Sequence, residues 1–117
     1  MKENILLDLS KKYAVDIINL TSKLQDNKKI VSIAVQLMRS GTSIGANVHE
    51  ANYASSKADF CNKLKIALKE NNETEYWLEI LKDTGNISKE TFEEMFSKNS
   101  KIKRLLINSI KTSAEVQ

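Results

Sequence analysis

Between residues 60 and 81, apolar or small polar residues recur at alternating spacings of four and three without a slip. This heptad pattern is typical of a helix in a bundle, because it keeps one stripe of side chains against neighbouring helices. It therefore predicts a long helix with several helical neighbours. The positions are Phe60, Leu64, Ala67, Asn71, Thr74, Leu78 and Leu81.

Three more segments carry apolar residues at the spacings of three and four that indicate amphipathic helices. They span residues 3–24, residues 29–53 and a segment that follows Ser88. The 117 residues include no proline and only three glycines, which favours long uninterrupted helices. Because short polar connections make successive helices antiparallel, we predict one all-α domain, residues 1–117, folded as an up-down-up-down four-helix bundle.

Local signals mark where two of these helices begin and where one ends. Ser56 and Asp59 resemble a capping box, in which a serine oxygen accepts a backbone N–H at the helix start. Gly85 suits the left-handed conformation that ends many helices, and Ser88 is a suitable cap for the next helix. The third helix is therefore expected between Ser56 and Gly85, and the fourth after Ser88.

Composition and charge placement limit the class of protein. The single Cys61 cannot form an internal disulfide, which favours a reducing compartment. Charged residues at positions 8, 11 and 12 interrupt the first apolar run too early for a signal peptide. Residues 30–48 include seven polar side chains, which argues against a membrane span. We expect a cytoplasmic protein with no membrane partner.

The second predicted helix carries little charge, although 28% of the chain is charged. Arg39 is the only charged residue between positions 30 and 49. Gly41 and Gly45 each cost about 1 kcal/mol in a helix interior, a cost that is tolerated where two backbones approach closely. This helix is therefore expected to be surrounded by protein.

Polar residues follow one face of the same helix, beside Arg39. As a functional site, this face would contact a ligand or RNA. As a structural element, it would form hydrogen bonds between helices or subunits, where an unpaired polar group costs about 1–3 kcal/mol. The small neighbouring residues favour the structural interpretation. The face consists of Ser40, Ser43, Asn47 and Glu50, at relative positions i, i+3, i+7 and i+10.

The third predicted helix has a second apolar strip beside its heptad seam. It is formed by Ile66, Trp77 and Ile80, with Tyr76 next to it. Two apolar faces on one helix indicate that the bundle meets another subunit there. The alternative is that Trp77 widens the core of a monomer, and both interpretations remain open at this point.

The fourth predicted helix carries an uneven charge in a chain with a net charge of only +3. Its segment 97–112 contains five cations and no acid, which would favour phosphate binding if several copies came together. In a monomer, the same residues are better explained as a solvated face that complements the helix dipole. The candidate nucleic-acid-binding residues are Lys98, Lys101, Lys103, Arg104 and Lys111.

The sequence predicts no catalytic residues, no metal site and no cofactor. Ser43 and His49 lie six residues apart on different helix faces, so they do not form a nucleophile–base pair. A di-iron bundle needs two Glu-x-x-His motifs, and the chain has one histidine. We therefore expect a protein that is not an enzyme.

The most specific motif in the chain resembles that of a family of small bacterial proteins. It comprises RSGTSIGAN (39–47), EA (50–51), SK (56–57) and DF (59–60), with KIALKE (65–70), ET (73–74) and YWL (76–78) further on. The chain is similar to the four-helix-bundle proteins associated with intervening sequences in 23S ribosomal RNA genes, which are related to accessory variability proteins of diversity-generating retroelements. The resemblance implies a homo-oligomer, typically a pentamer. In the retroelement branch it also implies contact with nucleic acid and a reverse transcriptase.

Residues and resemblance together predict a non-catalytic homo-oligomer that binds RNA or DNA. A reverse transcriptase or another protein is a second expected partner. The alternative is a purely structural or partner-binding oligomer without affinity for nucleic acid.

Overall fold

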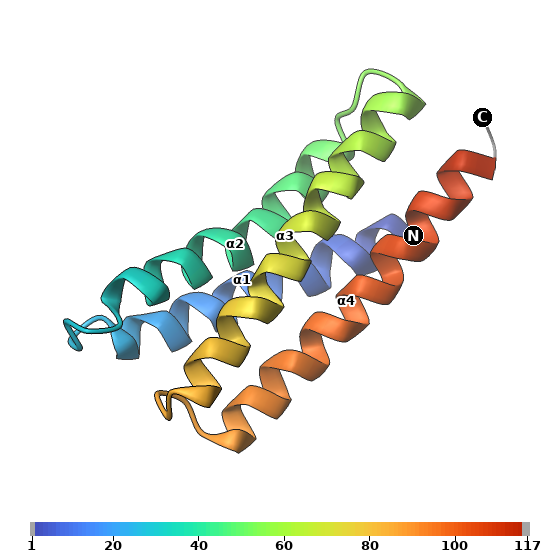
Figure 1. The fold of residues 1–117 in the computed structure, drawn as a ribbon. Coiled ribbons are helices and arrows are strands. Elements are labelled where there is room, and N and C mark those ends of the chain that lie inside the picture. The colour runs from blue at the N-terminus through green and yellow to red at the C-terminus, as the bar shows by residue number, and fades with distance from the viewer. Residues whose placement is uncertain (1, 116–117) are drawn as a thin grey trace.

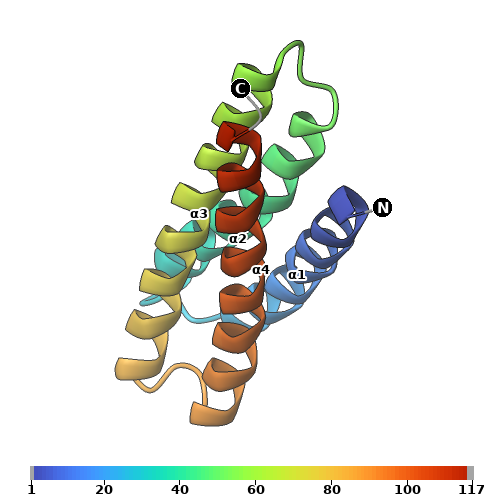
Figure 2. The same cartoon turned by 90° about the vertical axis from the view of Figure 1, so that its right-hand side faces the viewer.

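The computed structural model describes residues 2–115, with side chains from residue 5 to residue 114. Four helices follow one another: α1 (Lys2–Leu24), α2 (Val31–Ala51), α3 (Lys57–Asp83) and α4 (Lys89–Glu115). Each helix runs antiparallel to the one before it, and together they form a rod with extents of 47 × 22 × 20 Å (Figures 1 and 2). The predicted all-α, up-down-up-down four-helix bundle is confirmed.

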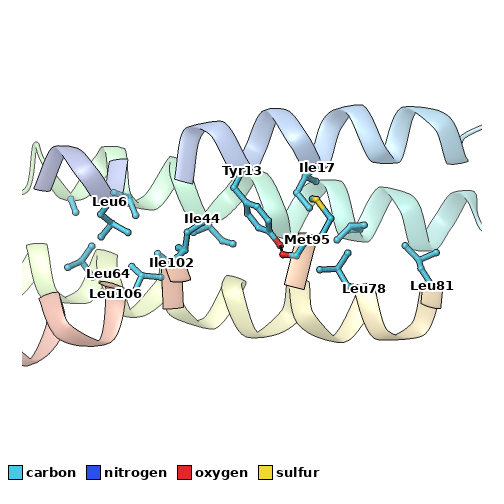
Figure 3. Close-up of a cluster of buried hydrophobic side chains, with 14 of the residues drawn as sticks. Leu6, Tyr13, Ile17, Ile44, Leu64, Leu78, Leu81, Met95, Ile102 and Leu106 are labelled. Carbon is cyan, nitrogen blue, oxygen red and sulfur yellow. Dashed lines mark hydrogen bonds between the residues drawn. The ribbon is translucent and has the colours of Figure 1, made fainter. Parts of the chain in front are cut away.

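The core runs along the length of the rod, and all four helices contribute to it (Figure 3). The predicted heptad seam of α3 is buried from Leu64 to Leu81, while Phe60 is partly buried at its end. Burial of large apolar side chains is the main term that holds such a bundle together. The largest of them are Tyr13, Ile17, Leu37, Ile44, Leu64, Leu78, Leu81, Ile102 and Leu106.

The predicted helix ends are largely confirmed. The hydroxyl oxygen of Ser56 accepts from the backbone N–H of Asp59 at 3.1 Å, and Gly85 has a φ of +74°. Ser88 likewise accepts from the N–H of Thr91 at 3.0 Å. Helix α2 is shorter than expected, because the Asn27 side chain accepts from the N–H of Lys29 and stabilises a turn that delays the helix.

Helices α1 and α2 approach closely at two glycines. A Cβ atom added to Gly41 would lie 2.8 Å from Cγ1 of Ile17, well inside van der Waals contact. At Gly45 an added Cβ would lie 3.2 Å from the backbone oxygen of Ser10. The helix propensity lost at these two positions is therefore offset by close packing against α1, as the composition of α2 predicts.

A layer of polar side chains crosses the core. Thr74 of α3 donates to the hydroxyl of Ser40 on α2 at 3.0 Å. Asn71 and Asn99 exchange side-chain-to-backbone hydrogen bonds at 3.1 and 3.3 Å, which joins α3 to α4. The side-chain oxygens of both asparagines are buried without a partner among the described residues. The Tyr13 hydroxyl donates to the carbonyl of Met95 at 3.2 Å, and burial raises its pKa above the usual range.

Candidate functional site

Three of the five candidate cations on α4 form one exposed basic face. Lys101, Arg104 and Lys111 are solvent-exposed and lie on one side of the helix, at relative positions i, i+3 and i+10. Within the described part of the chain, none of the three has an acidic partner within 4.0 Å. We call these three residues the α4 basic face, and their positive charges are available to an outside partner.

The other two candidate cations are paired with carboxylates of the same chain. Lys98 lies 2.9 Å from the carboxylate of Asp16 on α1 and 3.2 Å from Glu94, and the hydrogen bond with Asp16 raises its pKa. Lys103 pairs with Glu75 of α3. Asp16 and Glu75 lie on other helices, so local spacing gave no sign of those two pairs, whereas Glu94 stands four residues before Lys98 on α4. Lys98 and Lys103 therefore join helices rather than add to the exposed charge.

Arg39 connects α2 to α3 at the surface. Its guanidinium lies 3.0 Å from a carboxylate oxygen of Glu70 and pairs also with Glu73. The indole N–H of Trp77 donates to the same carboxylate of Glu73 at 2.9 Å. The Trp77 hydrogen bond, with a further contribution from Arg39, holds the pKa of Glu73 below its ordinary value. The only charge on the central part of α2 is thus neutralised within the chain.

The polar face predicted on α2 does not come together as one site. Ser40 is buried and contacts Thr74, whereas Ser43 donates to the backbone carbonyl of Arg39 at 2.6 Å. Asn47 in turn donates to the carbonyl of Ser43 at 2.8 Å, and Glu50 is exposed. Within this chain, Ser40 joins α2 to α3, whereas Ser43 and Asn47 bond to the backbone of α2.

The aromatic pair on α3 has one exposed and one partly buried member. Tyr76 is 56% exposed and stands edge-on to Trp77, with ring centroids 5.0 Å apart. Trp77 packs partly against the core through its ring and reaches Glu73 through its N–H. Trp77 therefore widens the core of the single chain, while Tyr76 and the 43%-exposed Ile66 leave apolar surface outside it.

One shallow pocket among the described residues was compared with the α4 basic face. A shallow hollow of about 440 Å³ lies at the α2–α3 connection, lined by Ala51, Asn52, Ala54, Ser56, Lys57 and Phe60. It brings no set of titratable groups together. In residues 2–115, no group of three or more His, Cys, Asp or Glu side chains is placed to hold a metal ion. Among the helices so described, none is long and apolar enough to cross a membrane.

The match with known sequences covers nearly the whole chain. The 23S rRNA-intervening sequence protein family matches over residues 2–108. This chain belongs to that family. The resemblance carried by residues 39–60 and by α3 is thereby confirmed. No curated protein gave a match to this 23S rRNA-intervening sequence protein.

A solved structure supports the same assignment. It is described as a protein of unknown function from the S23 ribosomal protein family of Bacteroides thetaiotaomicron VPI-5482. It shares 50% sequence identity with this 23S rRNA-intervening sequence protein, with a TM-score of 0.91, over 95% of this chain and 99% of that one. The family and this neighbour establish the fold and the kinship, and their descriptions name no reaction.

Proposed function

We propose that this 23S rRNA-intervening sequence protein is a non-catalytic homo-oligomer, of the pentameric kind, that binds RNA or DNA through the α4 basic face. The proposal is supported by a difference among the five predicted cations, of which, among the described residues, two are paired and three are not. Lys98 and Lys103 are neutralised by Asp16 and Glu75, while Lys101, Arg104 and Lys111 remain exposed without a partner among the described residues. Unpaired cations on one helix face suit the regularly spaced phosphates of a nucleic acid.

Assembly is what turns this small face into a binding surface. Three cations on one monomer give weak, strongly screened attraction, comparable to that of many ordinary surfaces. Repeating the face around an oligomer multiplies the phosphate contacts, and linked sites bind far more tightly than separate ones. The proposal therefore requires both self-association and charge, and the reverse transcriptase expected from the retroelement branch is a possible further partner of the same assembly.

The charge requirement is tested with a pair of charge-reversal variants. Lys101→Glu with Arg104→Glu reverses two members of the α4 basic face, whereas Lys23→Glu with Lys28→Glu makes the same net change at exposed positions in and after the last turn of α1. Binding of short single-stranded RNA and DNA probes is measured by fluorescence anisotropy from about 50 to 200 mM salt. We expect the α4 variant to lose at least tenfold in affinity, and the α1 variant to lose much less.

Mass measurement by light scattering, with and without the RNA probe, completes the test. A multimer near five times 13.2 kDa that shifts with RNA agrees with the proposal. A multimer that binds neither probe would instead favour the purely structural or partner-binding oligomer. Equal losses in the two charge-reversal variants would mean that binding follows net charge and not the α4 basic face.

A further inference from the structure

The connection between α2 and α3 carries an aromatic ring that the fold does not use. Tyr53 is 76% exposed, more than any other large apolar side chain in the described part of the chain. Tyr13, by contrast, is 1% exposed and belongs to the core. Because an apolar side chain stabilises a fold through burial, the ring of Tyr53 contributes little to stability. It is available to an outside partner.

A second ring and the local backbone hold Tyr53 in place. The imidazole of His49, one turn earlier on α2, has its centroid 5.3 Å from that of the tyrosine ring, with the two planes tilted by 51°. The backbone N–H groups of residues 52–54 donate to the carbonyls three residues earlier, at 3.2, 3.0 and 3.1 Å. We call His49 and Tyr53, which are both exposed, the aromatic pair. Rings that are ordered in advance lose less conformational freedom on binding.

The shallow hollow at the α2–α3 connection adjoins this pair. Asn52 and Ala54, the two neighbours of Tyr53 in the chain, both line the hollow. Its lining also includes the partly buried ring of Phe60 and the polar Ser56. Apolar and aromatic surface with a few polar groups is the usual lining of a ligand site, and the volume of about 440 Å³ lies in the range of such sites. Its shallow form suits a flat ring that stays partly in solvent.

The side chains of this region favour a flat, uncharged ligand with polar edges. Segment 49–60 contains two acids, Glu50 and Asp59, and one lysine, Lys57, so it has no excess of positive charge to attract phosphate. An exposed tyrosine ring stacks on any flat aromatic ligand, and the amide of Asn52 offers both a donor and an acceptor for a polar edge. A nucleobase combines these two properties. Contact here is therefore suited to the bases of a nucleic acid, whereas α4 is suited to its phosphates.

The α2–α3 connection and the last turns of α4 lie at the same end of the rod (Figures 1 and 2). Helix α3 begins at this end, and α4, which is antiparallel to it, ends there. Within the α4 basic face, Lys111 is therefore the member closest to this end, and Lys101 lies about 15 Å further along the helix axis. A strand that follows α4 towards Lys111 runs towards the end of the rod that carries the aromatic pair.

We propose that the aromatic pair and the hollow beside it bind an unpaired nucleobase of a single-stranded RNA or DNA. The ring of Tyr53 stacks on the face of the base, and Asn52 contacts its edge. The inference rests on the nucleic-acid binding proposed above, and it adds a base contact to the phosphate contacts of the α4 basic face. Because the bases of a duplex are already stacked on one another, this site favours single strands.

The test compares two substitutions of Tyr53 in the full chain. Tyr53→Ala removes the ring, whereas the matched control Tyr53→Phe keeps the ring and removes only the hydroxyl. Circular dichroism, urea unfolding and light scattering establish that both variants fold and have the mass of the wild type. Fluorescence anisotropy then measures binding of a short single strand, of the duplex of the same sequence and of an abasic strand, each at several salt concentrations. A strand that carries 5-iodouracil is also cross-linked to the wild type by ultraviolet light, and mass spectrometry locates the cross-link.

Base stacking predicts a loss that depends on the probe. We expect Tyr53→Ala to bind the single strand at least about fivefold more weakly than the wild type, and Tyr53→Phe to bind it equally well. The duplex and the abasic strand should not distinguish the variants, and the salt dependence should be unchanged, because no phosphate contact is lost. The cross-link should fall within segment 49–60.

The opposite results separate this inference from the proposed function. Undiminished binding by Tyr53→Ala, or cross-links confined to α4, overturns the base contact and leaves the α4 basic face intact. An equal loss with the abasic strand, or a changed mass of Tyr53→Ala, also overturns the base contact, because the tyrosine would then act on something other than a base. A wild type that binds no probe overturns the proposed function together with this inference.

Discussion

Helices α2 and α4 both pack against α1 and α3, yet they do so with different types of residue. Helix α2 uses glycine, serine and alanine, so that its backbone comes close to its neighbours, and its one central charge is neutralised by Glu70 and Glu73. Helix α4 keeps larger side chains in the core and places its unpaired cations outside.

In this small bundle, close packing is a property of α2 and exposed charge is a property of α4. A helix with little outward charge is suited to contact with protein on several sides, whereas a helix with an exposed basic row needs one side free. The close contacts of α2 leave no room for added atoms, while the polar contact of α4 with α3 leaves hydrogen-bonding capacity unused. Four variants, two of them paired with a control at an exposed position, test this contrast.

The largest effect is expected where α2 meets α1. Gly41→Val should lower the free energy of unfolding by about 3 kcal/mol, because the new side chain overlaps Ile17 in a packed core. Urea unfolding followed by circular dichroism measures the change. Ala58→Val, which adds two methyl groups at an exposed position in the first turn of α3, should cost no more than about 0.5 kcal/mol. Similar losses in the two variants would mean that Gly41 is not a close contact.

A smaller effect of opposite sign is expected where α4 meets α3. Asn99 donates to the backbone carbonyl of Asn71 and also hydrogen-bonds Tyr13, but its side-chain oxygen is buried without a partner among the described residues. Asn99→Leu should therefore raise the free energy of unfolding by about 1 kcal/mol, since it removes a costly buried polar atom at similar volume. The measurement is again urea unfolding.

The matched variant on the α2 side is Thr74→Val. Its hydroxyl oxygen lies 3.0 Å from the Ser40 hydroxyl and 2.8 Å from the carbonyl of Glu70, so the loss of these contacts should cost about 1–2 kcal/mol. We therefore predict that Thr74→Val lowers the free energy of unfolding and that Asn99→Leu raises it. A loss above 1 kcal/mol in Asn99→Leu would show that its side-chain oxygen has a partner in solution, such as a bound water molecule.

The smallest effect is expected at the surface pair of Glu73 and Arg39. Because the folded-state pKa of Glu73 is lowered, its stabilising contribution is present above the unfolded pKa, near 4.5, and disappears as the pH falls through the folded value. Its side chain is 31% exposed, so we expect the contribution to be at most about 1 kcal/mol.

Comparison with Glu73→Gln isolates that contribution. The difference in unfolding free energy between the wild type and this variant should be constant from pH 6 to 8 and should shrink below about pH 4.5. Glu93→Gln, at an exposed position on α4, should show almost no difference at any pH. A wild-type advantage that grows on acidification would contradict the lowered pKa.

The spacing of apolar residues could predict the fold, because the core contacts of a helix repeat at the same spacing. The heptad row of α3 identified Asn71 and Thr74 as core positions although both are polar, and both are buried. The same reasoning failed at Ile5, which continues the apolar stripe of α1 but is 54% exposed. It also left out Asn99, because an asparagine between two apolar turns resembles a surface residue.

The division of the candidate cations could not be predicted from the sequence. Glu94, four residues before Lys98, is a partner that the sequence of α4 shows, but the pair with Asp16, 82 residues away, is not readable from that sequence. The Arg39 pairs likewise join residues more than 30 positions apart. Local spacing determines which face a residue occupies, whereas the identity of its partner depends on how two helices are aligned in the folded chain.

Trp77 gives this bundle an intrinsic fluorescent probe. It is the only tryptophan in the chain, so the tryptophan emission of the protein comes from a single known place. The indole lies beside Tyr76 and donates to the carboxylate that Arg39 also contacts. One emission spectrum, recorded without any label, should therefore change when acid protonates Glu73 and removes the carboxylate that the indole contacts.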